Sequence, residues 1–239
     1  MTWSIVAHDP ATGAFAVAVT TCNFAVGASC PHVRAGVGAV STQSFTNRYL
    51  GPAVLDGMAR GLPPAAAIEG ALAGDDGRHL RQIHAVDRFG RSAAFTGANC
   101  VEWAGEHSSA GFSVAGNMLA GPAVLHDTVA AFAAHGDHPL PERLVLALEA
   151  GEAAGGDRRG RQSAAMKMVT TEDFPDLDIR VDDHPVPLEE LTRLLAIWRR
   201  DRAPFLDRQP RKTNPAGHVD MEAIEVAWKA AGLDLRFRR

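Results

Sequence analysis

The sequence predicts a mixed α+β fold in which two antiparallel sheets are flanked by pairs of helices. The first strands, Trp3–Ala7 and Ala14–Thr21, are joined by the turn-forming segment Asp9–Gly13 and are expected to form a hairpin. Both strands are apolar at nearly every position, so we expect both faces of their sheet to be covered. Helical segments come in pairs and do not alternate singly with strands, as they would in a βαβ protein.

The later elements repeat this order of strands followed by a helix pair. Apolar residues at helical spacing mark the helices, and short apolar runs mark the strands. Prolines stand at several helix starts, where a missing N–H costs no intrahelical hydrogen bond. The further strands expected are Val37–Thr42, Gln82–Asp87, Ser92–Thr96, Phe112–Gly116, Gln162–Val169 and Ile179–Val181. The helices expected are Pro52–Arg60, Pro63–Ala73, Pro122–Ala134, Leu140–Ala150, Pro187–Arg200 and Met221–Ala231.

A length of 239 residues suits one large domain with an appendage. We expect the main domain to span residues 1–200. The segment Asp201–Gly217 is rich in proline and charge, which is typical of a linker or an arm. Residues 201–239 are therefore expected to form a short C-terminal extension made of a linker and a helix.

The composition indicates which partners and cofactors the protein is expected to have. Hydrophobic residues make up 46% of the chain and the formal net charge is −4, so a large core is expected and a nucleic-acid or membrane partner is not. The start of the chain lacks the features of a signal peptide, which predicts a cytoplasmic protein. The three cysteines do not form a disulfide framework, and no metal or nucleotide motif occurs, so no metal and no cofactor is expected. The expected partner is a small-molecule substrate, and assembly into a homo-oligomer stays open.

Thr2 is the best candidate nucleophile. Removal of Met1, which is general when a small residue follows, would leave Thr2 with a hydroxyl and a free α-amine. An α-amine titrates near pH 8 in the absence of perturbation, so at neutral pH it can act as a base. Thr2 also opens the first strand directly, and a rigid strand end would hold a nucleophile in position. The alternative is that Thr2 is simply a small second residue.

Five separated motifs carry a resemblance to the domain of unknown function family 1028, from Thr2 to about Leu195. They are T-W-S-I-V-A-H-D-P-A-T-G-A-F-A-V-A-V at the start of the chain, R-A-G-V-G-A-V-S-T-Q at Arg34–Gln43, G-N-M-L-A-G at Gly116–Gly121, G-G-D-R-R-G-R-Q-S-A-A at Gly155–Ala165 and R-V-D-D-H-P at Arg180–Pro185. The resemblance implies the fold of N-terminal-nucleophile hydrolases, a four-layer αββα sandwich like that of proteasome β-subunits.

Proteasome β-subunits use a lysine near the nucleophile to tune its amine. The sequence has no lysine near the first strands. The resemblance therefore implies that Arg34, Arg159 or Lys167 substitutes for it, or that the mechanism differs.

Gln43 and Asn117 are further candidate catalytic residues. Gln43 follows the third apolar strand and could donate a hydrogen bond to a carbonyl oxygen, although it could equally cap the end of the sheet. Asn117 stands in a Gly-Asn pair. Its amide would be a good oxyanion donor. The alternative is a turn residue, because asparagine tolerates positive φ.

The segment Gly155–Ser163 is a candidate anion site. Backbone N–H groups around its glycines and nearby arginine side chains suit a carboxylate or a phosphate. The expected substrate-binding residues are Asp157, Arg158, Arg159, Gln162 and Ser163. The alternative is a solvated loop braced by an Asp157–arginine pair.

Together these features predict a hydrolase acting on a small amide or peptide-like substrate that carries a carboxylate. We expect Thr2 to face a pocket shared with Gln43, Asn117 and the Gly155–Ser163 loop. The alternative function is a non-catalytic binder of a small anionic metabolite on the same scaffold.

Overall fold

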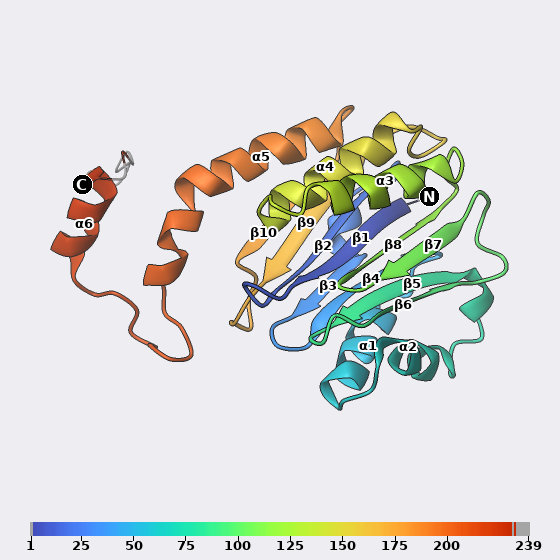
Figure 1. Cartoon of the computed structure of the whole chain (residues 1–239), viewed down its shortest axis with the longest axis horizontal. Coiled ribbons are helices and arrows are strands. Elements are labelled where there is room, and N and C mark those ends of the chain that lie inside the picture. Colours follow the sequence, from blue (N-terminus) through green and yellow to red (C-terminus); the bar gives the residue numbers. More distant parts are fainter. Residues whose placement is uncertain (1, 231, 233–239) are drawn as a thin grey trace. The chain divides into compact units, whose positions relative to one another are not determined.

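A computed structural model describes residues 2–230 and residue 232. The chain divides into two compact units, residues 1–192 and residues 193–239. The first unit contains both sheets and the candidate site (Figure 1). No helix among the described residues is long and apolar enough to cross a membrane.

The larger sheet has six antiparallel strands in the order β10-β9-β2-β1-β8-β7. The hairpin expected at the start of the chain lies at its centre, which explains why both strands are buried along almost their whole length. The strands are β1 (Thr2–Asp9), β2 (Ala14–Thr21), β7 (Gly105–Ser109), β8 (Phe112–Asn117), β9 (Ser163–Val169) and β10 (Leu177–Val181).

The smaller sheet has four antiparallel strands in the order β3-β4-β5-β6. They are β3 (Pro31–Arg34), β4 (Gly38–Ser44), β5 (Arg81–Asp87) and β6 (Ser92–Thr96). Val6, Phe15 and Val17 of the larger sheet pack against Ala39 and Val86 of the smaller one, so an apolar core joins the two sheets. This arrangement confirms the prediction of a mixed α+β fold with two antiparallel sheets.

Two strands have no counterpart in the sequence prediction. β7 has the sequence Gly-Glu-His-Ser-Ser and three exposed residues at its centre, so it lacks an apolar signal. β3 is only four residues long and begins with a proline. Both are edge strands, which need one paired neighbour and no buried face of their own.

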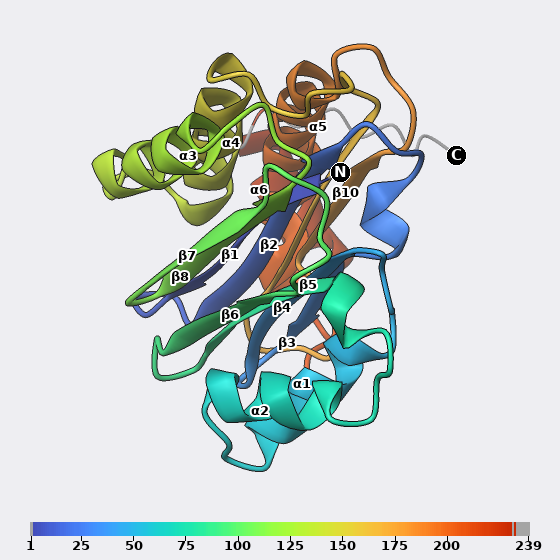
Figure 2. The same cartoon turned by 90° about the vertical axis from the view of Figure 1, so that its right-hand side faces the viewer.

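The described residues include six α-helices. α1 (Leu50–Ala59) and α2 (Pro64–Leu72) pack on the smaller sheet, with Val54 and Leu72 contributing to a core shared with Val40 and Ile83. α3 (Ala123–Ala134) and α4 (Leu140–Ala153) cover the larger sheet on the opposite side of the molecule (Figure 2). α5 (Pro187–Asp201) crosses from the first unit into the second, and α6 (Met221–Ala230) lies in the second unit.

The helix starts differ from the prediction by a few residues. α1 begins two residues before Pro52, because the Asn47 side chain accepts from the backbone N–H of Tyr49 and starts the turn early. The expected linker contains a short 3₁₀ helix, Ala203–Arg208. The expected end of the last helix, Ala231, lies outside the described residues.

Candidate active site

Thr2 lies at the end of a central strand of the larger sheet. It is the first residue of β1 and pairs with Asn117, the last residue of β8. Thr2 is buried, at 5% exposed. Its Oγ1 lies 3.2 Å from Oγ1 of Thr21, the last residue of β2, and donates to it. The neighbouring strand β2 therefore fixes the orientation of this hydroxyl through Thr21.

Hydrogen bonds lead from Thr2 to the guanidinium group of Arg159. The side-chain amide of Asn23 donates to Thr21 Oγ1 at 3.4 Å, and its oxygen accepts from Arg159 Nη1 at 3.3 Å. Arg159 is thus connected to the Thr2 hydroxyl through Thr21 and Asn23. The Arg159 side chain is 34% exposed, so it is partly in contact with solvent.

Asp157 holds Arg159 in place. Oδ2 of Asp157 accepts from Arg159 Nη2 at 3.2 Å and from the backbone N–H of Cys22 at 2.8 Å. Oδ1 accepts from the backbone N–H of Arg159 at 2.8 Å. The carboxylate is only 1% exposed, and the backbone of Asp157 bridges to Leu119. A buried carboxylate needs such charge-assisted partners, so Asp157 is a support for Arg159 in this arrangement.

Two other predicted binding residues also have partners within the protein. Ser163 is fully buried, donates to the Asn23 carbonyl at 2.6 Å and accepts from the Val26 N–H at 3.1 Å. Gln162 donates to Asp183 Oδ1 at 3.1 Å. These contacts fix the loop that carries Asn23. Arg158 and Arg159, in the same loop, are exposed. Substrate binding stays a prediction for all five residues, Asp157, Arg158, Arg159, Gln162 and Ser163.

Strand register separates the three cations that could act on Thr2. Lys167 pairs with Val17, which pairs with Val6, four residues along β1 from Thr2. That spacing corresponds to roughly 13 Å at the rise of a β-strand. Arg34 pairs with Gly38 at the opposite end of β4 from Gln43 and forms an ion pair with Asp56. Arg159 is the one of the three that lies at the Thr2 end of the sheets.

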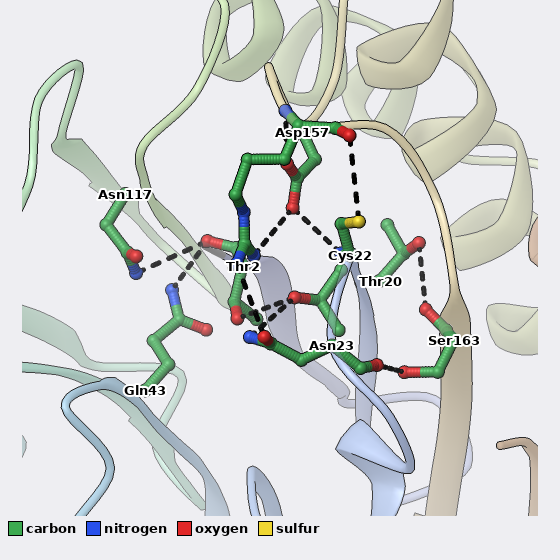
Figure 3. A network of polar contacts seen from close by, with 10 residues as sticks. Thr2, Thr20, Cys22, Asn23, Gln43, Asn117, Asp157 and Ser163 are labelled. Carbon is green, nitrogen blue, oxygen red and sulfur yellow. Dashed lines mark hydrogen bonds and ion pairs between the residues drawn. The ribbon is translucent and has the colours of Figure 1, made fainter. Parts of the chain in front are cut away.

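Gln43 and Asn117 converge on the Thr2 backbone. Their amide nitrogens lie 3.5 and 3.4 Å from the Thr2 carbonyl oxygen and donate to it (Figure 3). Both amides also donate to Gln82 Oε1 at 2.9 Å, and Gln43 donates to the Ala115 carbonyl at 3.0 Å. Gln82 in turn donates to the Gly116 carbonyl at 2.8 Å.

These contacts limit what Gln43 and Asn117 can do. An amide nitrogen carries two hydrogens, and each of these nitrogens has at least two acceptors within the protein. Neither has a hydrogen left for a substrate oxygen in this arrangement. Asn117 also lies in β8, and the residue with positive φ is the following Met118, so the alternative role of Asn117 as a turn residue is wrong.

A buried polar cluster continues from Gln43 between the two sheets. Ser4 Oγ donates to Gln43 Oε1 at 2.7 Å and also contacts His84 Nε2 at 2.7 Å and Ser41 Oγ at 3.0 Å. The direction of the hydrogen bond between Ser4 Oγ and His84 Nε2 depends on the tautomer of the imidazole ring. Burial lowers the pKa of His84 to about 3, so the ring is neutral. The Ser113 carbonyl faces the ring and opposes that shift, but His84 Nδ1 makes no hydrogen bond of ordinary geometry.

Strained backbone clusters around these residues. Among the described residues, the non-glycine positions with positive φ are Ala25, Ser44 and Met118, with φ of 54°, 71° and 54°. Ser44 directly follows Gln43, Met118 directly follows Asn117, and Ala25 lies in the loop that carries Asn23. Such backbone costs about 1–3 kcal/mol per residue and is found most often at functional sites.

Sequence reasoning missed four residues of this site: Thr21, Asn23, Gln82 and His84. A polar residue inside an otherwise apolar strand was the available signal for Gln82 and His84. Thr21 and Asn23 carried no comparable signal, because small polar residues are ordinary at the end of a strand. Among the described residues, no group of His, Cys, Asp and Glu side chains is arranged to hold a metal ion.

Comparisons with known proteins give the following matches. The model of DUF1028, a family of unknown function, matches residues 2–191. The crystal structure of SPO2555, a DUF1028 protein from Silicibacter pomeroyi, has 32% sequence identity and a TM-score of 0.84 over 90% of this chain and 94% of that one. Anbu, an ancestral β-subunit from Yersinia bercovieri, has 10% sequence identity and a TM-score of only 0.37 over 82% of this chain and 96% of its own. No curated protein matches the chain.

Proposed function

The chain belongs to DUF1028, a family of unknown function, and we propose that it is an amidohydrolase with Thr2 as its N-terminal nucleophile once Met1 is removed. The observation that carries this proposal is the position of the Thr2 hydroxyl, which is fixed at a strand end and connected through Thr21 and Asn23 to Arg159. The helix pairs outside both sheets support the four-layer αββα fold of N-terminal-nucleophile hydrolases as part of the proposal.

In the proposed reaction, Thr2 supplies both the nucleophile and the base. The α-amine takes the hydroxyl proton, directly or through a water, while Oγ1 forms a bond to the carbonyl carbon of the amide. The C–N bond then breaks, and the proton passes from the amine to the leaving nitrogen. Water hydrolyses the resulting Thr2 ester and regenerates the hydroxyl.

Thr21 and Arg159 have separate tasks in this reaction. Thr21 accepts from the Thr2 hydroxyl and so fixes the direction of Oγ1 in the resting site. The positive charge of Arg159 disfavours protonation of the Thr2 amine, which increases the fraction that can act as a base at neutral pH. Asp157 orients Arg159 for this task.

The anionic part of the substrate is proposed to bind at Arg158 or Arg159. Both side chains are exposed beside the site, and a planar guanidinium group pairs with a carboxylate through two parallel hydrogen bonds. Gln43 and Asn117 are proposed to position the Thr2 peptide group, since their amide hydrogens already have acceptors.

The test begins with the intact mass of the purified protein, which shows whether Met1 is removed. A β-lactone probe, which acylates nucleophilic hydroxyls, should then add its mass to residue 2 of the wild type and of Thr2→Ser, but not of Thr2→Ala. Retention of Met1, or equal labelling of Thr2→Ala, would overturn the proposal.

A non-catalytic binder of a small anionic metabolite is the second candidate. It is favoured by the occupied amide hydrogens of Gln43 and Asn117, which leave no side-chain oxyanion donor assigned. Binding of carboxylates that depends on Arg158 or Arg159, in a protein that the β-lactone does not label, would favour this candidate.

A further inference from the structure

We propose that Phe24 and Phe45 form an aromatic rim beside Thr2, and that the amide substrate carries an aromatic or other large apolar group that binds between them. The inference rests on the proposed function, because it treats Thr2 as the reacting residue. Phe24 and Phe45 are 70% and 73% exposed, and hydrogen bonds fix the backbone at or beside each of them.

Phe45 lies two residues after Gln43, which donates to the Thr2 carbonyl. Its backbone is held on both sides, since its N–H donates to the Leu80 carbonyl at 3.2 Å and its carbonyl accepts from Arg81 Nη1 at 2.6 Å. The Arg81 guanidinium also lies 5.9 Å from the centre of the Phe45 ring, within the range of a cation–π contact.

Arg81 is itself fixed by Asp75. The two side chains are 14% and 11% exposed and form hydrogen bonds of 2.9 and 3.1 Å. Hydrogen bonding to Arg81 holds the pKa of Asp75 well below its usual range. A largely buried ion pair therefore fixes the backbone of an exposed phenylalanine.

Phe24 is held in a similar way from the other sheet. The carbonyl of the preceding Asn23 accepts from the buried Ser163 hydroxyl at 2.6 Å, and the N–H of the following Ala25 donates to the Asp182 carbonyl at 2.9 Å. Asn23 also donates to Thr21, the hydrogen-bond partner of Thr2. Phe24 thus stands on a fixed loop that is hydrogen-bonded to Thr21, the partner of the proposed nucleophile.

Each ring is adjacent to strained backbone. Ala25, with φ of 54°, directly follows Phe24, and Ser44, with φ of 71°, directly precedes Phe45. Phe24 follows β2 of the larger sheet, three residues after Thr21, and Phe45 follows β4 of the smaller sheet, two residues after Gln43. Thr21 and Gln43 are both hydrogen-bonded to Thr2. A rigid aromatic pair loses little entropy on binding and gains from stacking and burial of apolar surface.

The test measures selectivity between two probes, N-acetyl-phenylalanine amide and N-acetyl-alanine amide, by ligand-observed NMR titration. The full chain carrying Thr2→Ala is used as the background, so no turnover occurs. We expect the phenylalanine probe to bind about ten-fold more tightly than the alanine probe. The ratio should fall to about one in the double variant Phe24→Ala/Phe45→Ala.

Phe89→Ala is the matched control. Phe89 is 66% exposed and contacts two arginines, whereas Phe45 contacts one. It lies in the turn between β5 and β6. This turn follows Asp87, which pairs with Gly38 at the opposite end of β4 from Gln43. We expect this variant to keep the selectivity. All replaced rings are exposed, so thermal unfolding should change little and will report any loss of folding.

Several results would overturn the aromatic rim. They are equal binding of the two probes to the Thr2→Ala background, unchanged selectivity in the double variant, and an equal loss in Phe89→Ala. A change of oligomeric state in the double variant with unchanged selectivity would instead assign the rings to contact with a second copy. Failure of the proposed function is distinguishable, because Thr2 would then resist β-lactone labelling while the probe selectivity persisted.

Discussion

Asp157 accepts three hydrogen bonds, two of them from Arg159, and the third joins it to the backbone of Cys22 at the end of β2. Through this carboxylate the loop before β9 is tied to the strand end that carries Thr21. The geometry of Arg159 relative to Thr2 therefore depends on the Asp157 carboxylate.

Asp157→Asn should destabilise the fold and weaken the site together. The amide keeps the shape of the side chain but loses the negative charge shared by Cys22 N–H and Arg159. Because hydrogen bonds to charged groups contribute about 1.5–3 kcal/mol each, we expect the free energy of unfolding to fall by about 2 kcal/mol. Urea denaturation measures this change, and the exposed Asp137→Asn serves as the control. Equal stability of Asp157→Asn and wild type would contradict a supporting role.

Removing the charge of Arg159 should shift the pH dependence of Thr2 acylation. If the guanidinium disfavours protonation of the Thr2 amine, Arg159→Gln raises the pKa of that amine and moves the acidic limb of the rate profile to higher pH. Arg159→Lys keeps a positive charge and should keep the limb. The measurement is the rate of β-lactone labelling as a function of pH. A limb at the same pH in all three proteins would exclude the effect.

Arg159→Lys should nevertheless weaken binding of a carboxylate-bearing substrate. A lysine cannot reproduce the planar fork of arginine. A carboxylate remote from the reacting bond is bound equally in the ground state and the transition state, so KM should rise more than kcat falls. Arg158→Ala should be measured in parallel. Unchanged KM in both variants would leave the Gly155–Ser163 loop with a structural role only.

Loss of the buried His84 should flatten the acid side of the stability profile. The pKa of His84 in the folded protein is about 3, below the value of about 6.5 for an unfolded chain. The unfolded state therefore takes up the proton first, and the contribution of neutral His84 is lost as pH falls from about 6.5 toward 3. We expect the free energy of unfolding to fall by about 1.4 kcal/mol per pH unit in the wild type relative to His84→Gln.

The comparison of the two proteins isolates His84. Burial also lowers the pKa of His8 and His32, and both histidines are present in the wild type and the variant. Urea titrations between about pH 6 and about pH 4 supply the two profiles, with the exposed His79→Gln as control. Parallel profiles would contradict the assigned state of His84.

Relieving the positive φ of Ala25 should stabilise the protein while loosening Phe24. Ala25→Gly removes the clash of Cβ in a left-handed conformation, and we expect a gain of roughly 0.5–1 kcal/mol in the free energy of unfolding. Ala28→Gly, in the same loop but without positive φ, should be destabilising. Thermal unfolding distinguishes the two. A loss of stability in Ala25→Gly would show that the conformation carries no strain.

Local sequence patterns specify most of the strands and helices. The Asp9–Gly13 turn and the two apolar runs beside it specify the first hairpin, and prolines with helical spacing specify the helix pairs, because these signals act within a few residues of one another. The edge strands β3 and β7 carry no such signal. They form because a neighbouring strand supplies backbone hydrogen bonds, and the side-chain pattern of an edge strand does not reveal this pairing.

The candidate site was only partly accessible from sequence. Thr2, Gln43, Asn117 and the Gly155–Ser163 loop were identified as polar signatures in an apolar chain, and the structure brings them to one end of the sheets. The folded chain adds two contacts that no local pattern predicts: Gln82 accepts from the amides of both Gln43 and Asn117, and Asp157 and Ser163 hold Arg159 and the Asn23 loop. The physical reason is that strand order and register set which side chains meet, and pairing of strands more than a hundred residues apart, such as β1 with β8 and β2 with β9, is not a local property of the chain.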